Sequence, residues 1–403
     1  MKPWLSVVGI GEDGFGGLSP AARALVETAE VLVGGERHFS MLPPADGNRP
    51  EQERIAWPKP LLDAMERISA MRGRRVCVLA TGDPMLFGVG ASLARHVPAE
   101  EMIIMPGLSA YSLAAARLGW PMEAVTLVTL HGRPVETLAR FVVPGARLII
   151  LAENAATPGA VRDWLLKRDF GDSRMVALAH MGGPRECRTE APARDWEAAV
   201  PDFHTLAVEC VAGPGAVWHP RIGLPDDAFE HDGKLTKREF RSLALAKLMP
   251  HAGALLVDIG AGCGSVGIEW MRAEENARAI ALEPRAERRA LAARNAAALG
   301  VPGLDIRAGT APAALDDVPA PDAVFVGGGV SDATIAASMQ ALKSGGRLVA
   351  HAVTLESEAV LLAAYSRHGG ELVRLAVARA EPVGSYRGWR PAMPVTQWAW
   401  RKP

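Results

Sequence analysis

The sequence predicts two α/β domains in series, the second of which contains a doubly wound sheet of seven strands. Three observations lead to this expectation. Short β-rich runs alternate with helical stretches along most of the chain. Glycine and proline become dense at residues 211–230 and interrupt that alternation. In the second half, one apolar strand breaks directly into a glycine turn that opens a helix.

The bulk composition is that of an ordinary globular protein. A chain of 403 residues has room for two or three domains, each able to bury its own core. Apolar residues make up 49% and charged residues 22%, and the formal net charge is −1. Nucleic-acid binding is usually accompanied by a basic excess, which this chain lacks. We therefore expect no nucleic-acid partner.

Four cysteines are scattered along the chain and form no C-x-x-C pair: Cys77, Cys187, Cys210 and Cys263. Without paired spacing or a neighbouring histidine they predict neither a disulfide framework nor a metal site. The chain runs almost at once into an apolar segment at residues 5–10, with no charged-then-apolar leader before it. No apolar run is long enough to cross a bilayer. We expect a cytoplasmic protein with reduced thiols and no membrane partner.

The first domain, residues 1–210, is predicted from strand-like runs separated by helical stretches. Each of these runs is short and β-rich. They are residues 5–10, 76–80, 102–105, 125–130, 147–151 and 175–179.

The second domain, residues 231–403, begins with a helical pattern at 237–248. Seven strand candidates follow it, at 254–259, 279–282, 304–307, 323–326, 347–352, 371–377 and 395–400. Only the Gly- and Pro-rich residues 380–393 separate the last two. A direct return without a helix predicts an antiparallel strand at the edge of the sheet.

The glycine turn indicates a nucleoside cofactor. In Val257–Ser265 the glycines allow a tight turn and a close approach of the backbone to a ligand. Glu283 ends the next apolar run, about 20 positions later, where a carboxylate can accept hydrogen bonds from two ribose hydroxyls. One alternative is a purely structural turn. The other is NAD, although Ser265 breaks the G-x-G-x-x-G pattern.

This region resembles class I S-adenosylmethionine (SAM) methyltransferases, which have a Rossmann-like sheet. The resemblance rests on the glycine turn, on the segment after the third strand and on the glycines after the fourth. It implies these cofactor contacts: Asp258, Gly260, Gly262, Gly264, Ser265, Glu283, Gly309, Thr310, Ala311, Gly327 and Gly328.

The segment 231–239 precedes the first strand of this domain. Thr236 and Glu239 have capping-box spacing, which is a structural explanation for them. The segment also resembles that of a small, decarboxylating precorrin methyltransferase, and the resemblance implies that Thr236 and Lys237 border the cofactor. His351 follows the fifth strand in a stretch similar to the same subfamily, or serves only as a strand end. His231 and His351 are the candidate catalytic acids by titration range, although a lone histidine is more often structural.

Three motifs in the first half resemble the tetrapyrrole methylase family (class III methyltransferases), whose fold has two α/β subdomains. Gly82 permits an unusual turn, Asp83 supplies an acceptor and Pro84 stiffens the loop. Ser109 stands where many relatives have two adjacent serines. His131-Gly132-Arg133 matches a subgroup that acts on late precorrins, or is a polar turn. The implied cofactor contacts are Gly9, Gly11, Gly82, Asp83, Pro84, Phe87, Gly107 and Ser109.

Together the two halves resemble the fused, decarboxylating precorrin methyltransferases of cobalamin biosynthesis. That resemblance implies methylation of precorrin-6B at meso carbons C5 and C15 and loss of the C12 acetate as carbon dioxide, to give precorrin-8. It implies one SAM per domain, with S-adenosylhomocysteine as the product. The first domain would act at C5, and the second at C15 with the decarboxylation. Relatives of both domains are commonly homo-oligomers.

A substrate with many carboxylates predicts basic residues around each cleft. The candidates are Arg133, Arg221, Arg238, Arg387 and Arg390, each of which is otherwise a solvated surface residue. For the methyl transfer, the protein mainly has to align SAM with the substrate carbon and to exclude water, and no metal is required. Two other readings stay open: a siroheme-type methylase fused to an RNA or small-molecule methyltransferase, and a first half that only binds tetrapyrrole.

Overall fold

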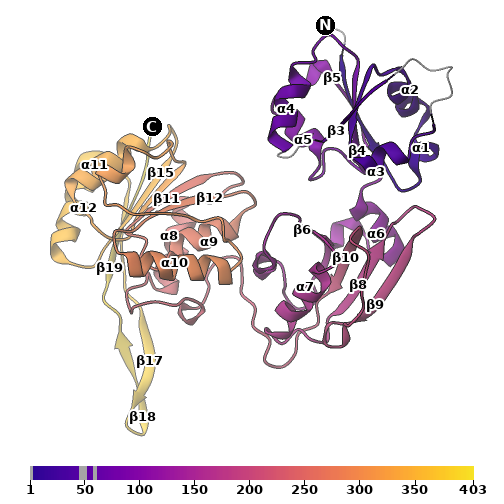
Figure 1. Cartoon of the computed structure of the whole chain (residues 1–403). Coiled ribbons are helices and arrows are strands. Elements are labelled where there is room, and N and C mark those ends of the chain that lie inside the picture. Colours follow the sequence, from indigo (N-terminus) through magenta and orange to yellow (C-terminus); the bar gives the residue numbers. More distant parts are fainter. Residues whose placement is uncertain (1–2, 45–51, 58–60) are drawn as a thin grey trace. The chain divides into compact units, whose positions relative to one another are not determined.

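The structure is a computed structural model that describes residues 3–44, 52–57 and 61–403. It forms two compact units (Figure 1). The first comprises Met1–Val135 and Val143–Val217, and the second comprises Glu136–Val142 and Trp218–Pro403.

The first unit begins with a five-stranded parallel sheet in the order β3-β2-β4-β1-β5. Helices cover both of its faces, as a parallel sheet requires. In β1 (Leu5–Ile10), Leu5 and Val7 therefore join one core cluster, whereas Val8 and Ile10 join the other. The other elements are α1 (Gly14–Gly17), α2 (Pro20–Thr28), β2 (Val31–Gly34), α3 (Glu36–Ser40), β3 (Glu53–Ala56), α4 (Leu61–Ser69), β4 (Val76–Thr81), α5 (Val89–Leu93), η1 (Ala99–Glu101) and β5 (Met102–Met105).

The rest of the first unit is built on a second five-stranded sheet, in the order β6-β7-β10-β8-β9. Only the pair β6 and β7 is parallel. Helix α6 packs Tyr111 and Ala114 onto Ile149 and Val176 of this sheet. The elements are α6 (Ala110–Leu118), η2 (Met122–Ala124), β6 (Thr126–Thr129), η3 (Val135–Arg140), β7 (Arg147–Leu151), α7 (Thr157–Leu166), β8 (Arg174–Ala179), β9 (Cys187–Pro192), η4 (Ala193–Asp195) and β10 (His204–Glu209).

All six strands expected in the first half are present, and no expected bound differs from the observed one by more than one residue. The prediction missed β2, β3, β9 and β10. Strand β3 is an edge strand whose residues are all exposed or half-buried, so it carries no apolar run. Strand β9 is an edge strand whose residues are all exposed or half-buried, so it carries no apolar alternation.

The second unit contains a seven-stranded sheet in the order β13-β12-β11-β14-β15-β19-β16. Leu256 of β11 packs on one face with α8 and α9, while Leu255 and Val257 pack on the other with α11 and α12. The sheet is thus covered on both sides, as a doubly wound sheet is. The elements are η5 (Asp226–Ala228), α8 (Arg238–Leu248), β11 (Leu255–Ile259), α9 (Ser265–Ala273), β12 (Arg278–Leu282), α10 (Ala286–Ala298), β13 (Asp305–Arg307), η6 (Ala313–Leu315), β14 (Ala323–Val326), α11 (Asp332–Ala341), β15 (Arg347–Ala352), α12 (Leu355–His368), β16 (Glu371–Leu375), β17 (Ala378–Val383), β18 (Tyr386–Pro391) and β19 (Val395–Arg401).

All seven strands were predicted, but the expectation of an antiparallel edge strand was wrong in its position. Strand β19 is antiparallel to both neighbours and lies between β15 and β16, so that β16 forms the edge. Pairing on both sides lets β19 bury Val395 and Trp398. The residues between the last two strands form a hairpin of β17 and β18, which projects from the sheet (Figure 1).

A positive φ at Gly384 turns the hairpin between the paired residues Val383 and Tyr386. No helix within the described ranges has both the length and the apolar composition needed to cross a bilayer.

Candidate functional site

In the second unit, the turn after β11 has three glycines in conformations that favour glycine. Gly260, Gly262 and Gly264 have φ of +69°, +59° and +81°, which side-chain-bearing residues rarely adopt. A Cβ at Gly260 would also lie 2.9 Å from the backbone nitrogen of Gly328. Gly264 is the N-cap residue of α9, whose first residue is the buried Ser265. The turn therefore brings the backbones after β11 and β14 together at the carboxyl edge of the sheet.

Two buried carboxylates lie at this turn. Glu283 accepts hydrogen bonds from the Gly262 N–H at 2.9 Å and from the Arg285 N–H at 3.0 Å. Asp258 accepts one from the Gly267 N–H of α9 at 3.1 Å. Burial, helped by the charge of Glu283, raises the pKa of Asp258 to about 7. Glu283 is thus fixed beside the turn with lone pairs left for further donors.

The other two predicted loops reach the same edge. The Gly327 N–H donates to the Ile259 carbonyl at 3.0 Å, which ties the end of β14 to the end of β11. After β13, a Cβ at Gly309 would lie 2.7 Å from the Cβ of Ala314, so this loop folds closely onto its own continuation. Thr310 is exposed there, and Ala311 is half-buried against the core.

The segment 231–239 passes over the glycine turn, with the Lys234 carbonyl oxygen 3.5 Å from the position of a Cβ at Gly262. The expected capping box is wrong. Helix α8 has Lys237 as its N-cap residue, one position later than a Thr236 cap would require. The Thr236 carbonyl instead accepts a hydrogen bond from Arg241 at 2.5 Å. The Lys237 Nζ lies 3.7 Å from Asp226 Oδ2.

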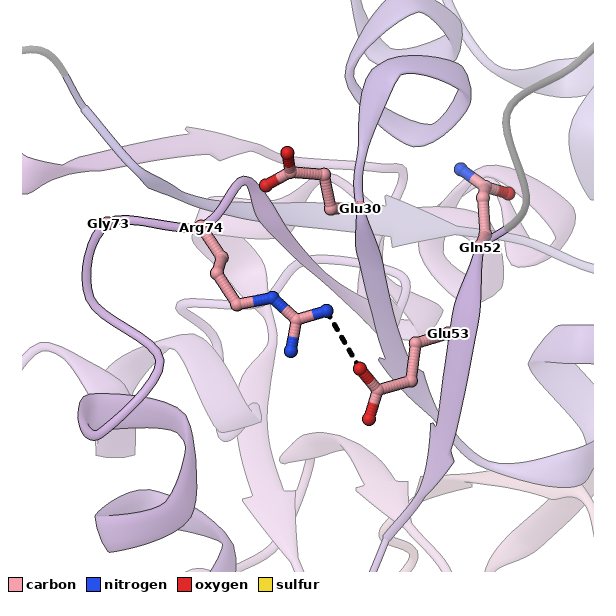
Figure 2. Close-up of a pocket in the computed structure, with 5 residues that line it drawn as sticks. All are labelled: Glu30, Gln52, Glu53, Gly73 and Arg74. Atoms are coloured by element: carbon pink, nitrogen blue, oxygen red, sulfur yellow. Dashed lines mark hydrogen bonds and ion pairs between the residues drawn. The ribbon is translucent and has the colours of Figure 1, made fainter.

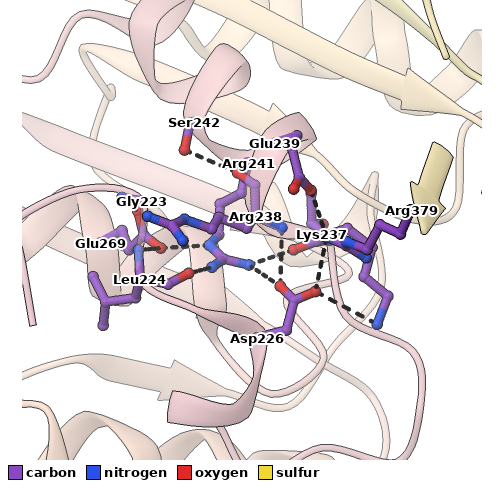
Figure 3. A network of polar contacts seen from close by, with 11 residues as sticks. Gly223, Leu224, Asp226, Lys237, Arg238, Glu239, Arg241, Ser242, Glu269 and Arg379 are labelled. Carbon is purple, nitrogen blue, oxygen red and sulfur yellow. Dashed lines mark hydrogen bonds and ion pairs between the residues drawn. The ribbon is translucent and has the colours of Figure 1, made fainter. Parts of the chain in front are cut away.

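Arg241 is the centre of a buried polar network in which it connects three segments (Figure 3). Its Nε lies 2.5 Å from Glu269 Oε1 of α9, and both side chains are 0% exposed. It also donates to the carbonyls of Leu224 and Thr236. Glu269 in turn accepts from the Gly223 and Leu224 N–H groups at 2.6 and 3.0 Å. The network therefore holds segment 231–239 against the helix that follows the glycine turn.

The two candidate histidines have different surroundings. His231 is exposed, and its Nδ1 accepts from the Gly233 N–H at 3.0 Å. His351 is buried at the end of β15, with Nε2 2.9 Å from Gln397 Oε1 and the ring edge against Phe325. Burial lowers the pKa of His351 to about 4. Its ring is therefore neutral near pH 7 and carries no imidazolium proton to donate.

Arg221 lies near Arg272 of α9. Burial and then neighbouring guanidinium groups, that of Arg221 among them, lower the pKa of Arg272 to about 10. Arg272 is in the last turn of α9, and a helix of nine residues is about 13 Å long. Arg221 thus lies near the end of α9 that points away from the glycine turn.

The other candidate arginines of this unit are exposed at or beyond the carboxyl edge. Arg238 begins α8, and Arg387 and Arg390 are on β18. Arg390 pairs with Glu381 across the hairpin at 3.0 Å. Arg379, which the sequence did not single out, pairs with Glu239 at 2.6 Å and joins the base of the hairpin to α8.

In the first unit, three glycine loops meet at the carboxyl edge of the parallel sheet. A Cβ at Gly9 would lie 1.9 Å from the Gly82 carbonyl oxygen and 2.4 Å from the Gly107 nitrogen. The Gly107 N–H donates to that same carbonyl at 3.1 Å. The φ of Gly82 is +61°. Gly11 follows β1, and a Cβ there would lie 2.7 Å from Asp13 Oδ1.

The loop after Gly82 is held by its own polar groups. Asp83 Oδ1 accepts from the Met85 N–H at 2.8 Å, and Pro84 is buried. Phe87 has a φ of 55° and is 52% exposed, with its ring 6.0 Å from that of Tyr111. Ser109 caps α6 by accepting from the Ser112 N–H at 3.0 Å.

Arg133 is exposed and lies close enough for its charge to act on Tyr111. Burial is the larger effect there and raises the pKa of Tyr111. Arg133 and Phe87 are therefore near the same side chain.

One polar cluster beside these loops was not expected from the sequence. Glu12, next to Gly11, contacts Arg37, His180 and Arg185. An acidic residue directly after the first glycine motif was the available signal. The basic partners come from distant segments, so spacing could not have revealed them.

A separate pocket lies at the opposite edge of the parallel sheet, where β2 and β3 begin (Figure 2). Arg74 forms an ion pair there with Glu53 at 2.8 Å, so these two charges of the pocket neutralise each other. All four cysteines are free thiols. Among the described residues, no three His, Cys, Asp or Glu side chains gather as metal ligands.

Comparison with known proteins gives matches to both halves and to the whole chain. The tetrapyrrole (corrin/porphyrin) methylase family model matches residues 5–196, and the precorrin methyltransferase domain model matches 227–402. The chain is 47% identical over 405 residues to the precorrin-6Y C(5,15)-methyltransferase [decarboxylating] of a Sinorhizobium species, covering 100% of this chain and 97% of that protein.

Two shorter relatives match less than half of the chain each. The cobalt-precorrin-7 C(5)-methyltransferase of Salmonella typhimurium is 32% identical, covering 43% of this chain and 82% of its own length. The probable cobalt-precorrin-6B C(15)-methyltransferase (decarboxylating) of Pyrobaculum calidifontis is 38% identical, covering 41% and 88%.

Proposed function

Because the chain belongs to the precorrin-6Y C(5,15)-methyltransferase (decarboxylating) family, we propose that it methylates precorrin-6B at C5 and C15 and removes the C12 acetate as carbon dioxide, giving precorrin-8. It is a SAM-dependent methyltransferase of cobalamin biosynthesis. Two observations support the proposal. Each unit has a glycine-lined strand edge, and the chain is 47% identical to the Sinorhizobium relative over 97% of that protein.

The second unit fits SAM through its turn and its buried carboxylate. Glu283 is oriented by two backbone N–H groups and would accept hydrogen bonds from the ribose hydroxyls. The positive-φ turn from Gly260 to Gly264 would face the amino-acid end, with Asp258 and Ser265 beneath it. Thr236 and Lys237 would border the same cofactor, with Gly309–Ala311 beside the adenine and Gly327–Gly328 beneath it. SAM supplies a methyl group that is already electrophilic.

The first unit fits a second SAM along its three glycine loops. Gly9, Gly82 and Gly107 approach one another too closely for any side chain, which leaves backbone groups at the strand ends to face a ligand. Gly11, Asp83, Pro84, Phe87 and Ser109 complete the proposed contacts, although the capping bond of Ser109 already uses one of its lone pairs.

We assign the C5 methylation to residues 1–210 and the C15 methylation with decarboxylation to residues 231–403, joined by 211–230. The two shorter relatives support a division of this kind, since each covers less than half of the chain and one is named for C(5) and the other for C(15). The full-length match disfavours a fusion with an RNA methyltransferase.

The residues of the chain mainly bind, align and exclude water in this reaction. Decarboxylation requires protonation of the conjugated ring, and His231 is the proposed donor, because His351 is neutral and buried. Arg133, Arg238, Arg387 and Arg390 are the proposed partners of substrate carboxylates. A cytoplasmic location is consistent with the free thiols. We also propose a homo-oligomer, as the resemblance to the two families implies.

Mass spectrometry of the product tests this proposal. The intact chain, given precorrin-6B and SAM, should add two methyl groups and lose one carbon dioxide. Asp83→Ala should remove the C5 methyl alone, and Glu283→Ala should remove the C15 methyl. An unchanged carboxylate count in the wild-type product would refute the decarboxylase assignment. Two methyls from Asp83→Ala would refute the assignment of the first site.

A further inference from the structure

The first unit contains a cationic cluster built around one buried carboxylate. Glu12 follows Gly11 directly after β1, and its side chain is 6% exposed. It pairs with Arg37, with His180 Nδ1 at 2.9 Å and with Arg185 Nη2 at 3.6 Å. Within the described residues, Glu12 is the one carboxylate that pairs with either arginine. Two guanidinium groups against a single carboxylate leave a local surplus of positive charge.

The cluster is held in a fixed geometry by the loop between β8 and β9. His180 has a φ of 50°, a conformation that side-chain-bearing residues rarely adopt. A Cβ at Gly183 would lie 2.7 Å from the Cβ of Glu12, so only glycine lets this loop pack so closely. The loop thereby places Arg185 beside the strand end that carries Gly11.

Arg37 is anchored on three sides. Besides pairing with Glu12, its Nη2 lies 2.8 Å from Thr81 Oγ1, and its guanidinium carbon lies 3.9 Å from the centre of the Phe203 ring. These contacts orient a planar fork whose five donors are not all used. Arg37 is therefore preorganised to bind an anion, at little further cost in side-chain entropy.

Thr81 offers a further donor next to Gly82. His38 Nδ1 accepts from the Gly35 N–H at 3.2 Å, and burial lowers the pKa of His38 to about 4. The neutral ring must then carry its proton on Nε2 and donate to Thr81 Oγ1, 3.0 Å away. Thr81 Oγ1 accepts from both His38 and Arg37, which leaves its hydroxyl hydrogen for another acceptor.

The neighbouring loops add an exposed apolar surface. Met85, Phe87 and Leu108 are all exposed, and they follow the same strand ends as the glycine motifs. Large exposed apolar side chains beside a cationic cluster match a ligand with a flat apolar ring and anionic side chains.

We propose that Arg37 and Arg185, with the Thr81 hydroxyl, bind a carboxylate side chain of the tetrapyrrole in the first unit, and that Glu12 is the positioning residue that aligns the two guanidinium groups. This inference rests on the proposed function, since the ligand is the precorrin substrate. It adds residues outside the glycine motifs and outside the arginines chosen from the sequence.

Steady-state kinetics of Arg185→Gln and Arg37→Gln test the proposal, with C5 methylation followed by mass spectrometry. Losing a charge-assisted hydrogen bond should raise the KM for precorrin-6B about tenfold in each variant, with the KM for SAM unchanged. Arg185→Lys should recover part of that loss as a point charge. Methylation at C15 should be unaffected.

Arg75→Gln is the matched control. Arg75 is 66% exposed and lies 3.6 Å from Glu30, while Arg185 is 71% exposed and lies 3.6 Å from Glu12. The proposal is overturned if neither glutamine variant changes the KM for precorrin-6B by more than Arg75→Gln does. It is also overturned if the KM for SAM rises in parallel. Failure of the wild-type chain to methylate C5 would instead refute the proposed function.

Discussion

Replacing Arg241 with methionine should destabilise the second unit selectively. The change keeps an unbranched apolar stem but removes the guanidinium group, which leaves Glu269 charged and 0% exposed without its cationic partner. Breaking a buried ion pair in this way costs about 3–5 kcal/mol. Glu269 keeps its hydrogen bonds from the Gly223 and Leu224 N–H groups, so we expect the lower end, about 3 kcal/mol.

Hydrogen exchange measured by mass spectrometry on peptides from α8 and α9 reports this unit alone. A loss of about 3 kcal/mol corresponds to roughly a hundredfold loss of protection. Lys247→Met on the same helix is the control. It breaks the exposed ion pair in which Lys247 Nζ lies 2.6 Å from Glu371 Oε2. It should lower the free energy of unfolding by less than about 1 kcal/mol.

A second variant separates charge from packing. Arg241→Met combined with Glu269→Gln removes the buried negative charge. It also gives up one of the two backbone hydrogen bonds, because the amide nitrogen cannot accept, so it should recover only part of the lost protection. The buried Arg241–Glu269 pair does not stabilise the unit as predicted if Arg241→Met loses no more protection than Lys247→Met, or if the double variant is as unprotected as the single one.

Three further changes have definite expected results. Gly260→Ala forces a Cβ within 2.9 Å of the Gly328 nitrogen at a φ of +69°, so calorimetric titration should detect the loss of one SAM site of two. Because the pKa of His351 is about 4 in the fold and 6.5 in the unfolded chain, its contribution of about 3 kcal/mol is full above pH 6.5 and is lost as the pH falls towards 4. His351→Gln should flatten the dependence of the unfolding free energy on pH in that window, and an unchanged slope would contradict the assignment. Arg238→Gln should raise the KM for precorrin-6B, whereas Arg221→Gln, at the far end of α9, should leave it unchanged; equal effects in a kinetic assay would count against this placement.

Local patterns were sufficient where the determinant is local. The turn from Gly260 to Gly264 was predicted because its backbone conformations allow little other than glycine. The central strands β11, β12, β14 and β15 of the second unit were predicted because burial on both faces gives each an apolar run.

Features set by distant contacts were not predictable in this way. The insertion of β19 between β15 and β16 is a matter of strand order, which carries no period. The capping box failed because the Thr236 carbonyl is bound by Arg241, whose position depends on Glu269. Glu12 was missed because its partners, Arg37 and Arg185, come from other segments of the chain.

Two independent donor sites in one chain are the basis of the whole account, and titration calorimetry of the intact chain with SAM examines them directly. We predict two equivalents of SAM bound per chain, with one remaining in Gly260→Ala. A single equivalent bound by the wild-type chain, or no loss of binding in that variant, would contradict the account.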